Sequence, residues 1–311
     1  MKRLVLAYSG SRAAALAIPR LAEKYDAEIV ALVLDVGQGK DLEAIRDRAL
    51  STGAVRAHVL DVREEFARQY MLRALRANAL FRDGSSLTPA LLRPLIAQKL
   101  VEIADIEQTL AIAHGYPPDD MGINTAARAL NPKMKVLASL PRAAGSSPAI
   151  PAAKRPADCP DEPAYLEVTF ERGTPTATNG IAMSLLDLTS TVAVIAAAHG
   201  IGSLVQTDAA AAVLQAAHRE LQRSVLTEVA QSFSKVVSQQ YADIIATGSW
   251  FSMLREALDA YIDKIQHDAN GVIRLKLLKG ACEVVERKPS TRRYTTKHLQ
   301  IATATDIAPE H

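Results

Sequence analysis

The sequence predicts an α/β protein with a mostly parallel sheet covered by helices on both faces, followed by a smaller unit of mixed strands and helices. Two observations carry this prediction. Over residues 1–140, short apolar runs that suit buried strands alternate with stretches of helical periodicity. After residue 163 the order changes to a strand pair, long helices and a final hairpin.

Residues 1–140 are expected to form the parallel sheet and its helices. The expected strands are residues 4–8, 28–36, 56–62, 109–115 and 135–140. The expected helices run from the first strand through Lys24 and over residues 41–53, 64–80 and 92–104. Pro19 cannot donate a hydrogen bond to the Ala15 carbonyl, so it either kinks the first helix or marks its true start.

A change of composition separates the two units. Residues 141–163 hold six prolines and are expected to form a linker or a long loop. The second unit is expected over residues 164–287, and a polar, loosely held tail over 288–311. Its expected elements are a strand pair with a turn at Asn179–Gly180, a helix over 184–199, long helices over 208–247, a helix within 252–271 and a hairpin over 272–287.

Composition excludes several classes of protein. The net charge of +2 is too small to predict nucleic acid or an acidic membrane as the main partner. Cys159 and Cys282 lie far apart, which indicates neither a disulfide framework nor a zinc site and favours a reducing compartment. No run approaches the roughly 18 apolar residues that span a bilayer. We therefore expect a cytoplasmic protein.

The stretch "VLAYSGSRAAALAIPR" at residues 5–20 places a Ser-Gly turn between a strand and a helix. Such a turn exposes backbone N–H groups at the positive end of the helix dipole, where phosphates commonly bind. Ser11, however, is a poorer choice than glycine where φ is positive, and the alanines at 13–15 offer no oxygen to a phosphate or its magnesium. Without further information, a phosphate site and a plain turn both remain open.

Several longer blocks in both units resemble the argininosuccinate synthase family, in the family's order and spacing. They include "LVLAYSG", "LRPLIAQKLVEIA", "DEPAYLEVTFERGTP", "AAHREL" and "ADIIATGSWFSMLREALDAYIDKIQ". The resemblance implies an ATP-pyrophosphatase-like (adenine nucleotide alpha hydrolase-like) domain, then a smaller α+β synthetase and multimerisation domain. It also implies a reaction: ATP adenylates citrulline, and aspartate then displaces AMP.

The resemblance also implies positions for the ligands. Those that correspond to nucleotide contacts are Ala7, Tyr8, Ser9, Gly10, Ser11, Arg12, Leu34 and Gly115, and those that correspond to substrate contacts are Arg93 and Asp119. The family loop reads S-G-G-x-D-[ST]-S. Here Ser11 replaces its second glycine, Ala13 its aspartate, and Ala14 and Ala15 its hydroxyls.

Other substrate motifs of the family are altered or missing. The segment "PPDDMG" replaces a longer substrate-binding stretch, and Ser85 stands where the family has a tyrosine. Two further substrate stretches have no counterpart: residues 141–163 span the first gap and "GSLVQTDAAAA" the second. We assign no catalytic residue and no metal ligand. ATP binding is possible, and magnesium only together with ATP.

Three functional hypotheses follow. The first is a non-catalytic member that acts as a scaffold, regulatory or partner subunit, paired with an active synthase or another enzyme of its pathway. The second is a divergent ATP-dependent ligase with a different substrate, and the third is a still-active synthase. A homo-oligomer, dimer or tetramer, is expected in each case. The trio Ser9, His114 and Asp35 could be drawn as a hydrolase triad, but the G-x-S-x-G elbow of such enzymes is absent. His58, His199 and His218 are expected to be core or surface histidines, not ligands.

Overall fold

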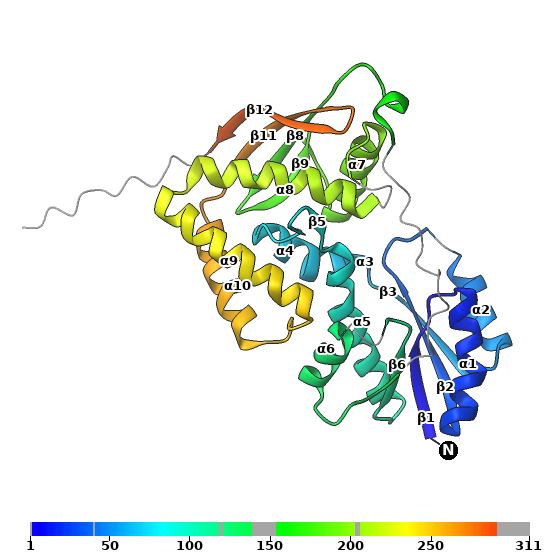
Figure 1. Ribbon diagram of the computed structural model, residues 1–311. Helices are drawn as coiled ribbons and strands as arrows, with labels where there is room; N and C mark the ends of the chain where they lie inside the picture. Colours follow the sequence, from blue (N-terminus) through cyan, green and yellow to red (C-terminus); the bar gives the residue numbers. More distant parts are fainter. Residues whose placement is uncertain (1, 40, 118–120, 139–153, 203–205, 291–311) are drawn as a thin grey trace, which may run out of the picture.

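A five-stranded parallel sheet forms the first unit of the chain (Figure 1). The computed structural model describes residues 2–39, 41–117, 121–138, 154–202 and 206–290. The strands lie in the order β3-β2-β1-β6-β7, and every neighbouring pair is parallel. Their bounds are β1 Lys2–Ala7, β2 Ala27–Asp35, β3 Arg56–Asp61, β6 Ala111–His114 and β7 Lys135–Ala138. The predicted strands and their parallel arrangement are confirmed.

Helices cover both faces of this sheet, as the alternation of strands and helices predicts. On one face, α1 (Arg12–Tyr25) and α2 (Leu42–Ser51) share a buried cluster with Leu4 and Leu6 of β1. On the other face, α5 (Thr88–Ile106) and α6 (Gly122–Leu130) share a second cluster with Val5. Successive side chains of β1 point to opposite faces of the sheet, so a single apolar strand serves both cores.

The helix α1 is continuous through Pro19. It begins at Arg12, so the alternative start near Pro19 is wrong. Ser11 provides the reason, because its hydroxyl accepts a hydrogen bond from the Ala14 N–H and caps the helix at the earlier position. The α6 helix, by contrast, had no counterpart among the expected elements.

The connection from β3 to α5 differs from the single helix expected over residues 64–80. It contains α3 (Arg63–Glu65), a π-helix η1 (Phe66–Met71) and α4 (Leu72–Arg76), followed by the short hairpin of β4 (Phe81–Arg82) and β5 (Ser85–Ser86). The expected helix is therefore wrong beyond Ala77. Asn78 takes a left-handed conformation, with φ +54°, and its side chain bonds to His218 and Gln222 of the second unit.

The second unit contains an antiparallel sheet in the order β10-β9-β8-β11-β12. The strands are β8 Ala164–Glu171, β9 Thr174–Thr178, β10 Ile181–Ala182, β11 Gly271–Leu278 and β12 Ala281–Pro289. The turn at Asn179–Gly180 and the final hairpin are confirmed. A second turn at Arg172–Gly173 divides the predicted pair into three strands, and β12 extends two residues into the expected tail.

Four helices accompany this sheet among the described residues after 164: α7 Leu185–Ala198, α8 Gln206–Val225, α9 Glu228–Thr247 and α10 Met253–Gln266. The helices expected over 184–199 and 252–271 are confirmed, and the long helical region over 208–247 divides near Thr227, which caps α9. Between 154 and 163, the proline-rich segment forms only the 3-10 turn η2 (Pro156–Asp158). Its residues 141–153, like the tail beyond 290, lie outside the described residues.

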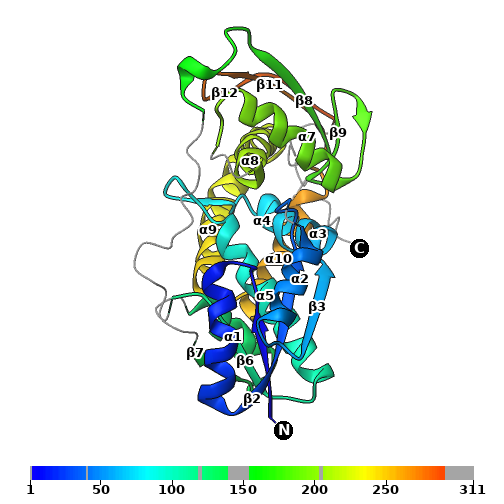
Figure 2. The same ribbon diagram turned by 90° about the vertical axis from the view of Figure 1, so that its right-hand side faces the viewer.

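A third buried cluster joins the two units. Tyr70 of η1 and Leu75 of α4 pack with Leu188, Leu214 and Trp250 of the second unit. Figure 2 shows α4 between the antiparallel sheet at the top and the parallel sheet below. None of the helices in the described part of the chain is long and apolar enough to cross a membrane.

Candidate functional site

The loop after β1 has the backbone geometry of an anion-binding turn. Gly10 has φ +71°, and a Cβ at this position would lie 2.7 Å from the side chain of Ile45 in α2. A glycine is therefore required both by the backbone conformation and by the close approach of α2. The chain then enters α1 directly, so the first N–H groups of that helix face the carboxyl edge of the sheet.

The side chains of this loop interact with one another. The Ser11 hydroxyl caps Ala14, and the Ser9 hydroxyl donates to Ser11 Oγ over 3.1 Å. The first turn of α1 contains no acidic residue, and Arg12 is exposed without a hydrogen bond or ion pair to any described residue. The turn can therefore offer an anion backbone N–H groups and one guanidinium. It has no carboxylate for a metal ion.

Arg48 of α2 stabilises this loop through a hydrogen bond to its backbone. Its Nη1 donates to the Gly10 carbonyl over 2.9 Å, which fixes the turn without any ligand. Burial raises the pKa of Tyr8, and the nearby charge of Arg48 partly opposes this effect. Sequence reasoning missed Arg48, because it looks like any polar residue on an amphipathic helix.

The end of β2 forms a turn that its own side chains stabilise. Leu34 is half-buried, and its carbonyl accepts a 2.8 Å hydrogen bond from Gln38 Nε2. Asp35 accepts from the Gly37 N–H over 2.9 Å and lies 3.5 Å from Arg63 Nε. Hydrogen bonds from Arg63 lower the pKa of Asp61, at the end of β3, to about 2. Arg63 thus engages both of these carboxylates.

The end of β6 brings Gly115 to the same edge, because β6 lies beside β1 in the sheet. His114 Nδ1 accepts from the Tyr116 N–H over 3.3 Å, and its Nε2 lies 2.9 Å from Asn124 Oδ1. The guanidinium of Arg93, on α5, lies 6.0 Å from the centre of the Tyr116 ring. The two loops flank a topological switch point, since α1 and α6 cover opposite faces of the sheet. Ligands of α/β sheets bind at such points.

The fold therefore gathers most of the predicted site residues at one edge. Residues 7–12, Leu34 and Gly115 lie at the ends of neighbouring strands, and Arg93 reaches the segment beside Gly115. Asp119 lies outside the described residues. The alternative hydrolase triad is not formed, because both ring nitrogens of His114 are engaged by Asn124 and the Tyr116 backbone.

An apolar cavity of about 120 Å³ was not anticipated from the sequence. It lies where β2 ends against the second unit, between the η1, α7 and α8 elements. Most of its lining is aliphatic, and Arg63 is the charged residue among the lining residues: Val36, Gly37, Arg63, Phe66, Ala67, Met71, Leu72, Leu75, Leu80, Leu185, Leu186, Thr189, Ser190, Ala193, Ala210, Ala211 and Leu214. No sequence signal marks it, since its walls come from distant segments.

The parallel sheet, the loop before α1 and the switch point define a HUP-type α/β domain joined to a second, sheet-containing unit. Comparison with known proteins agrees. Residues 3–148 match the "Arginosuccinate synthase N-terminal HUP domain", and residues 141–311 match the "Arginosuccinate synthase C-terminal domain". The chain belongs to the argininosuccinate synthase family.

Individual relatives named "Argininosuccinate synthase" match nearly the whole chain. The protein of Symbiobacterium thermophilum is 35% identical over 367 aligned residues, which cover 97% of this chain and 91% of the relative. The relative from Dehalococcoides mccartyi is 36% identical, and its alignment covers 97% of this chain and 89% of the relative. The relative from Bacillus thuringiensis is 34% identical, and its alignment covers 98% of this chain and 92% of the relative. Each alignment is longer than the chain's 311 residues, so the relatives carry segments that this chain lacks.

Proposed function

We propose that this member of the family does not make argininosuccinate and acts as a non-catalytic scaffold, regulatory or partner subunit. The observation that carries the proposal is the start of α1. Family members carry a carboxylate and two hydroxyls there, whereas this helix begins with Arg12 and three alanines. Removing one preorganised group that stabilises developing charge costs a reaction about 3–4 kcal/mol. The loss of several such groups is expected to abolish the original synthesis.

The surroundings of the loop support the same proposal. A phosphate fits the N–H groups of α1, because Gly10 and Arg48 keep the turn in shape. Among the described residues of this loop, magnesium finds no free carboxylate, because the first turn of α1 has none and Arg63 engages both Asp35 and Asp61. We therefore derive no step through a metal ion, and we propose residual nucleotide binding without turnover.

Activity measurement tests the proposal directly. The purified chain is incubated with ATP, magnesium, citrulline and aspartate, and pyrophosphate and argininosuccinate are quantified. The Symbiobacterium thermophilum relative serves as the positive control. We expect no product above the enzyme-free background. A turnover rate close to that of the relative would overturn the proposal.

The apolar cavity favours a second candidate, a divergent ATP-dependent ligase with a less polar substrate. Burying an uncompensated ureido group among leucines and alanines is unfavourable, whereas an aliphatic group suits such walls. Thermal unfolding with ATP, AMP and a panel of amino acids tests this candidate, since a ligand at 100 times its Kd stabilises the fold by about 2.7 kcal/mol. Unchanged unfolding temperatures with every compound would exclude it.

We further propose that the chain works as an oligomer, either with copies of itself or with an active synthase or another enzyme of its pathway. The support is an apolar stripe on α9, where Val229, Phe233 and Val236 follow at intervals of four and three residues and are at least half exposed. Light scattering measures the mass in solution. A monomer at all concentrations, alone and with an active relative, contradicts this proposal.

A further inference from the structure

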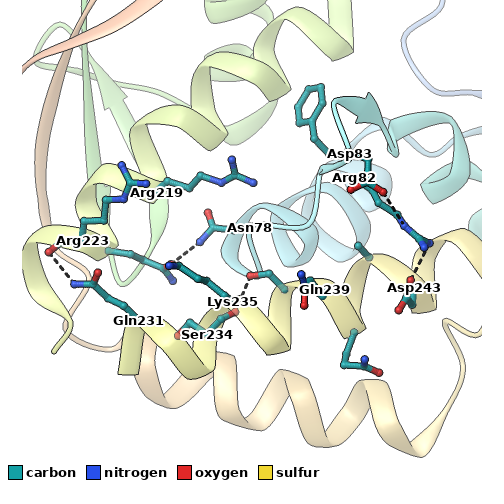
Figure 3. Close-up of a pocket in the computed structure, with 15 residues that line it drawn as sticks. Asn78, Arg82, Asp83, Arg219, Arg223, Gln231, Ser234, Lys235, Gln239 and Asp243 are labelled. Atoms are coloured by element: carbon teal, nitrogen blue, oxygen red, sulfur yellow. Dashed lines mark hydrogen bonds and ion pairs between the residues drawn. The ribbon is translucent and has the colours of Figure 1, made fainter. Parts of the chain in front are cut away.

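A second hollow lies away from the edge that carries the nucleotide-type loop. Figure 3 shows this polar pocket, of about 580 Å³, between α8, α9 and the segment that leads into the β4–β5 hairpin. None of the residues at the ends of β1, β2 or β6 lines it. Its size lies in the range of small-molecule sites.

Two cations in this pocket have no counter-charge among the described residues. Arg82 pairs with Asp243 over 2.8 Å and lies 3.7 Å from Asp83, and Arg223 pairs with Glu220, which Arg287 also engages. Arg219 on α8 and Lys235 on α9 make neither an ion pair nor a hydrogen bond with any described residue. Burial, together with the charge of Arg223, lowers the pKa of Arg219.

The neutral polar groups of the pocket differ in what they can still bind. Gln231 already donates to the carbonyls of Arg223 and Leu226, and Ser238 donates to two others. Gln239 and Gln240 have no hydrogen bond to the described part of the protein, so their amides can still donate to a ligand. The pocket thus combines two uncompensated positive charges from facing helices with free amide donors.

We propose that this pocket binds a small molecule with two or more negative charges, held by Arg219 and Lys235. Phosphate and carboxylate groups both provide this chemistry, through hydrogen bonds to guanidinium and ammonium groups. The chain's own C-terminal residues are an unsuitable occupant. Residues 291–311 contain Arg292, Arg293 and Lys297 against Asp306 and Glu310.

Calorimetric titration at low salt tests the proposal, with pyrophosphate as the phosphate probe and citrate as the carboxylate probe. The test variant Arg219→Gln/Lys235→Gln removes both cations. Its matched control, Arg128→Gln/Lys264→Gln, removes the same charges from α6 and α10 outside the pocket. A third variant, Arg12→Gln, reports separately on the loop before α1. Circular dichroism confirms that each variant is folded, and the two single substitutions replace the double variant if it is not.

We expect at least one probe to bind the parent and the control equally, and the double variant about tenfold more weakly or worse, because each lost charge-assisted hydrogen bond weakens binding. The stronger probe identifies the anionic group. Binding that is lost in Arg12→Gln but kept in the double variant would place the anion at the α1 loop and overturn the proposal. The absence of binding by both probes at millimolar concentration would overturn it too.

Discussion

Gly10 shows how much the loop after β1 depends on a single residue. Its φ of +71° disfavours any side chain, and a Cβ would lie 2.7 Å from Ile45. We expect Gly10→Ala to lower the free energy of unfolding by about 2–4 kcal/mol, the sum of left-handed strain and a steric clash. Urea unfolding, followed by circular dichroism, measures the change.

Gly39 provides the matched control for this prediction. It also has a positive φ, +63°, but a Cβ there would meet nothing within 4 Å. Gly39→Ala is therefore expected to cost only the conformational strain, about 1–2 kcal/mol. Equal losses in the two variants would show that the contact with α2 does not constrain Gly10.

At the site, local features could be predicted from the sequence, whereas contacts between distant residues could not. The strand–turn–helix around Ser9 and Gly10 could be predicted, because the pattern is local. The hydrogen bond from Arg48 to Gly10 and the bonding of His114 to Asn124 could not, since each joins segments whose approach depends on the whole sheet. The ligand-binding role of the gathered residues remains a prediction.

Pro19 lies inside α1 on an exposed part of the helix. It cannot donate to the Ala15 carbonyl, and its ring crowds the preceding turn. Pro19→Ala restores that hydrogen bond, and we expect it to stabilise the protein by about 1–3 kcal/mol. Thermal and urea unfolding of the variant measure the gain.

Pro94, inside α5, offers the comparison within the same fold. Its ring is buried, so Pro94→Ala also removes packed atoms and leaves a small void. We expect a smaller gain than at Pro19, or a net loss. An equal gain at both positions would show that packing of the proline ring contributes little to either helix.

At the scale of elements, predictions succeeded where the pattern was both local and strong. The strands of the parallel sheet are continuous apolar runs, and α7 begins at a Ser184 cap and ends before Gly200. The helix expected over residues 64–80 ends early, because hydrogen bonds with His218 and Gln222 hold Asn78 in a non-helical conformation. The π-helix over 66–71 has no local signature either, since a π-helix differs from an α-helix only in its hydrogen-bond register.

At the scale of the whole molecule, His218 joins the two units. Its ring nitrogens lie 2.8 Å from Asn78 Oδ1, in the first unit, and 3.1 Å from Gln266 Oε1, in the second. Burial lowers the pKa of His218 to about 4, although the hydrogen bond with Gln266 opposes the shift. The unfolded chain therefore binds a proton below about pH 6.5, which the folded chain accepts only near pH 4.

This difference predicts a loss of stability in mild acid. Above pH 6.5 the neutral ring of His218 leaves the free energy of unfolding at its full value. As the pH decreases from 6.5 toward 4, this free energy falls by up to about 3 kcal/mol. In His218→Gln, urea unfolding at several pH values should show a flatter dependence over this window. His267→Gln, at an exposed position, serves as the control and should keep the dependence of the parent. An unchanged pH dependence in His218→Gln would contradict the assignment.

The three alanines at the start of α1 affect the helix as well as the chemistry of the loop. Alanine is the strongest helix former in a helix interior, but residues 13–15 lie in the first turn, directly after the Ser11 cap. An acidic side chain there would interact favourably with the helix dipole, and this first turn has none. The start of α1 is therefore stabilised by the Ser11 cap and by α2: Ile45 lies directly against Gly10, and Arg48 donates to the Gly10 carbonyl.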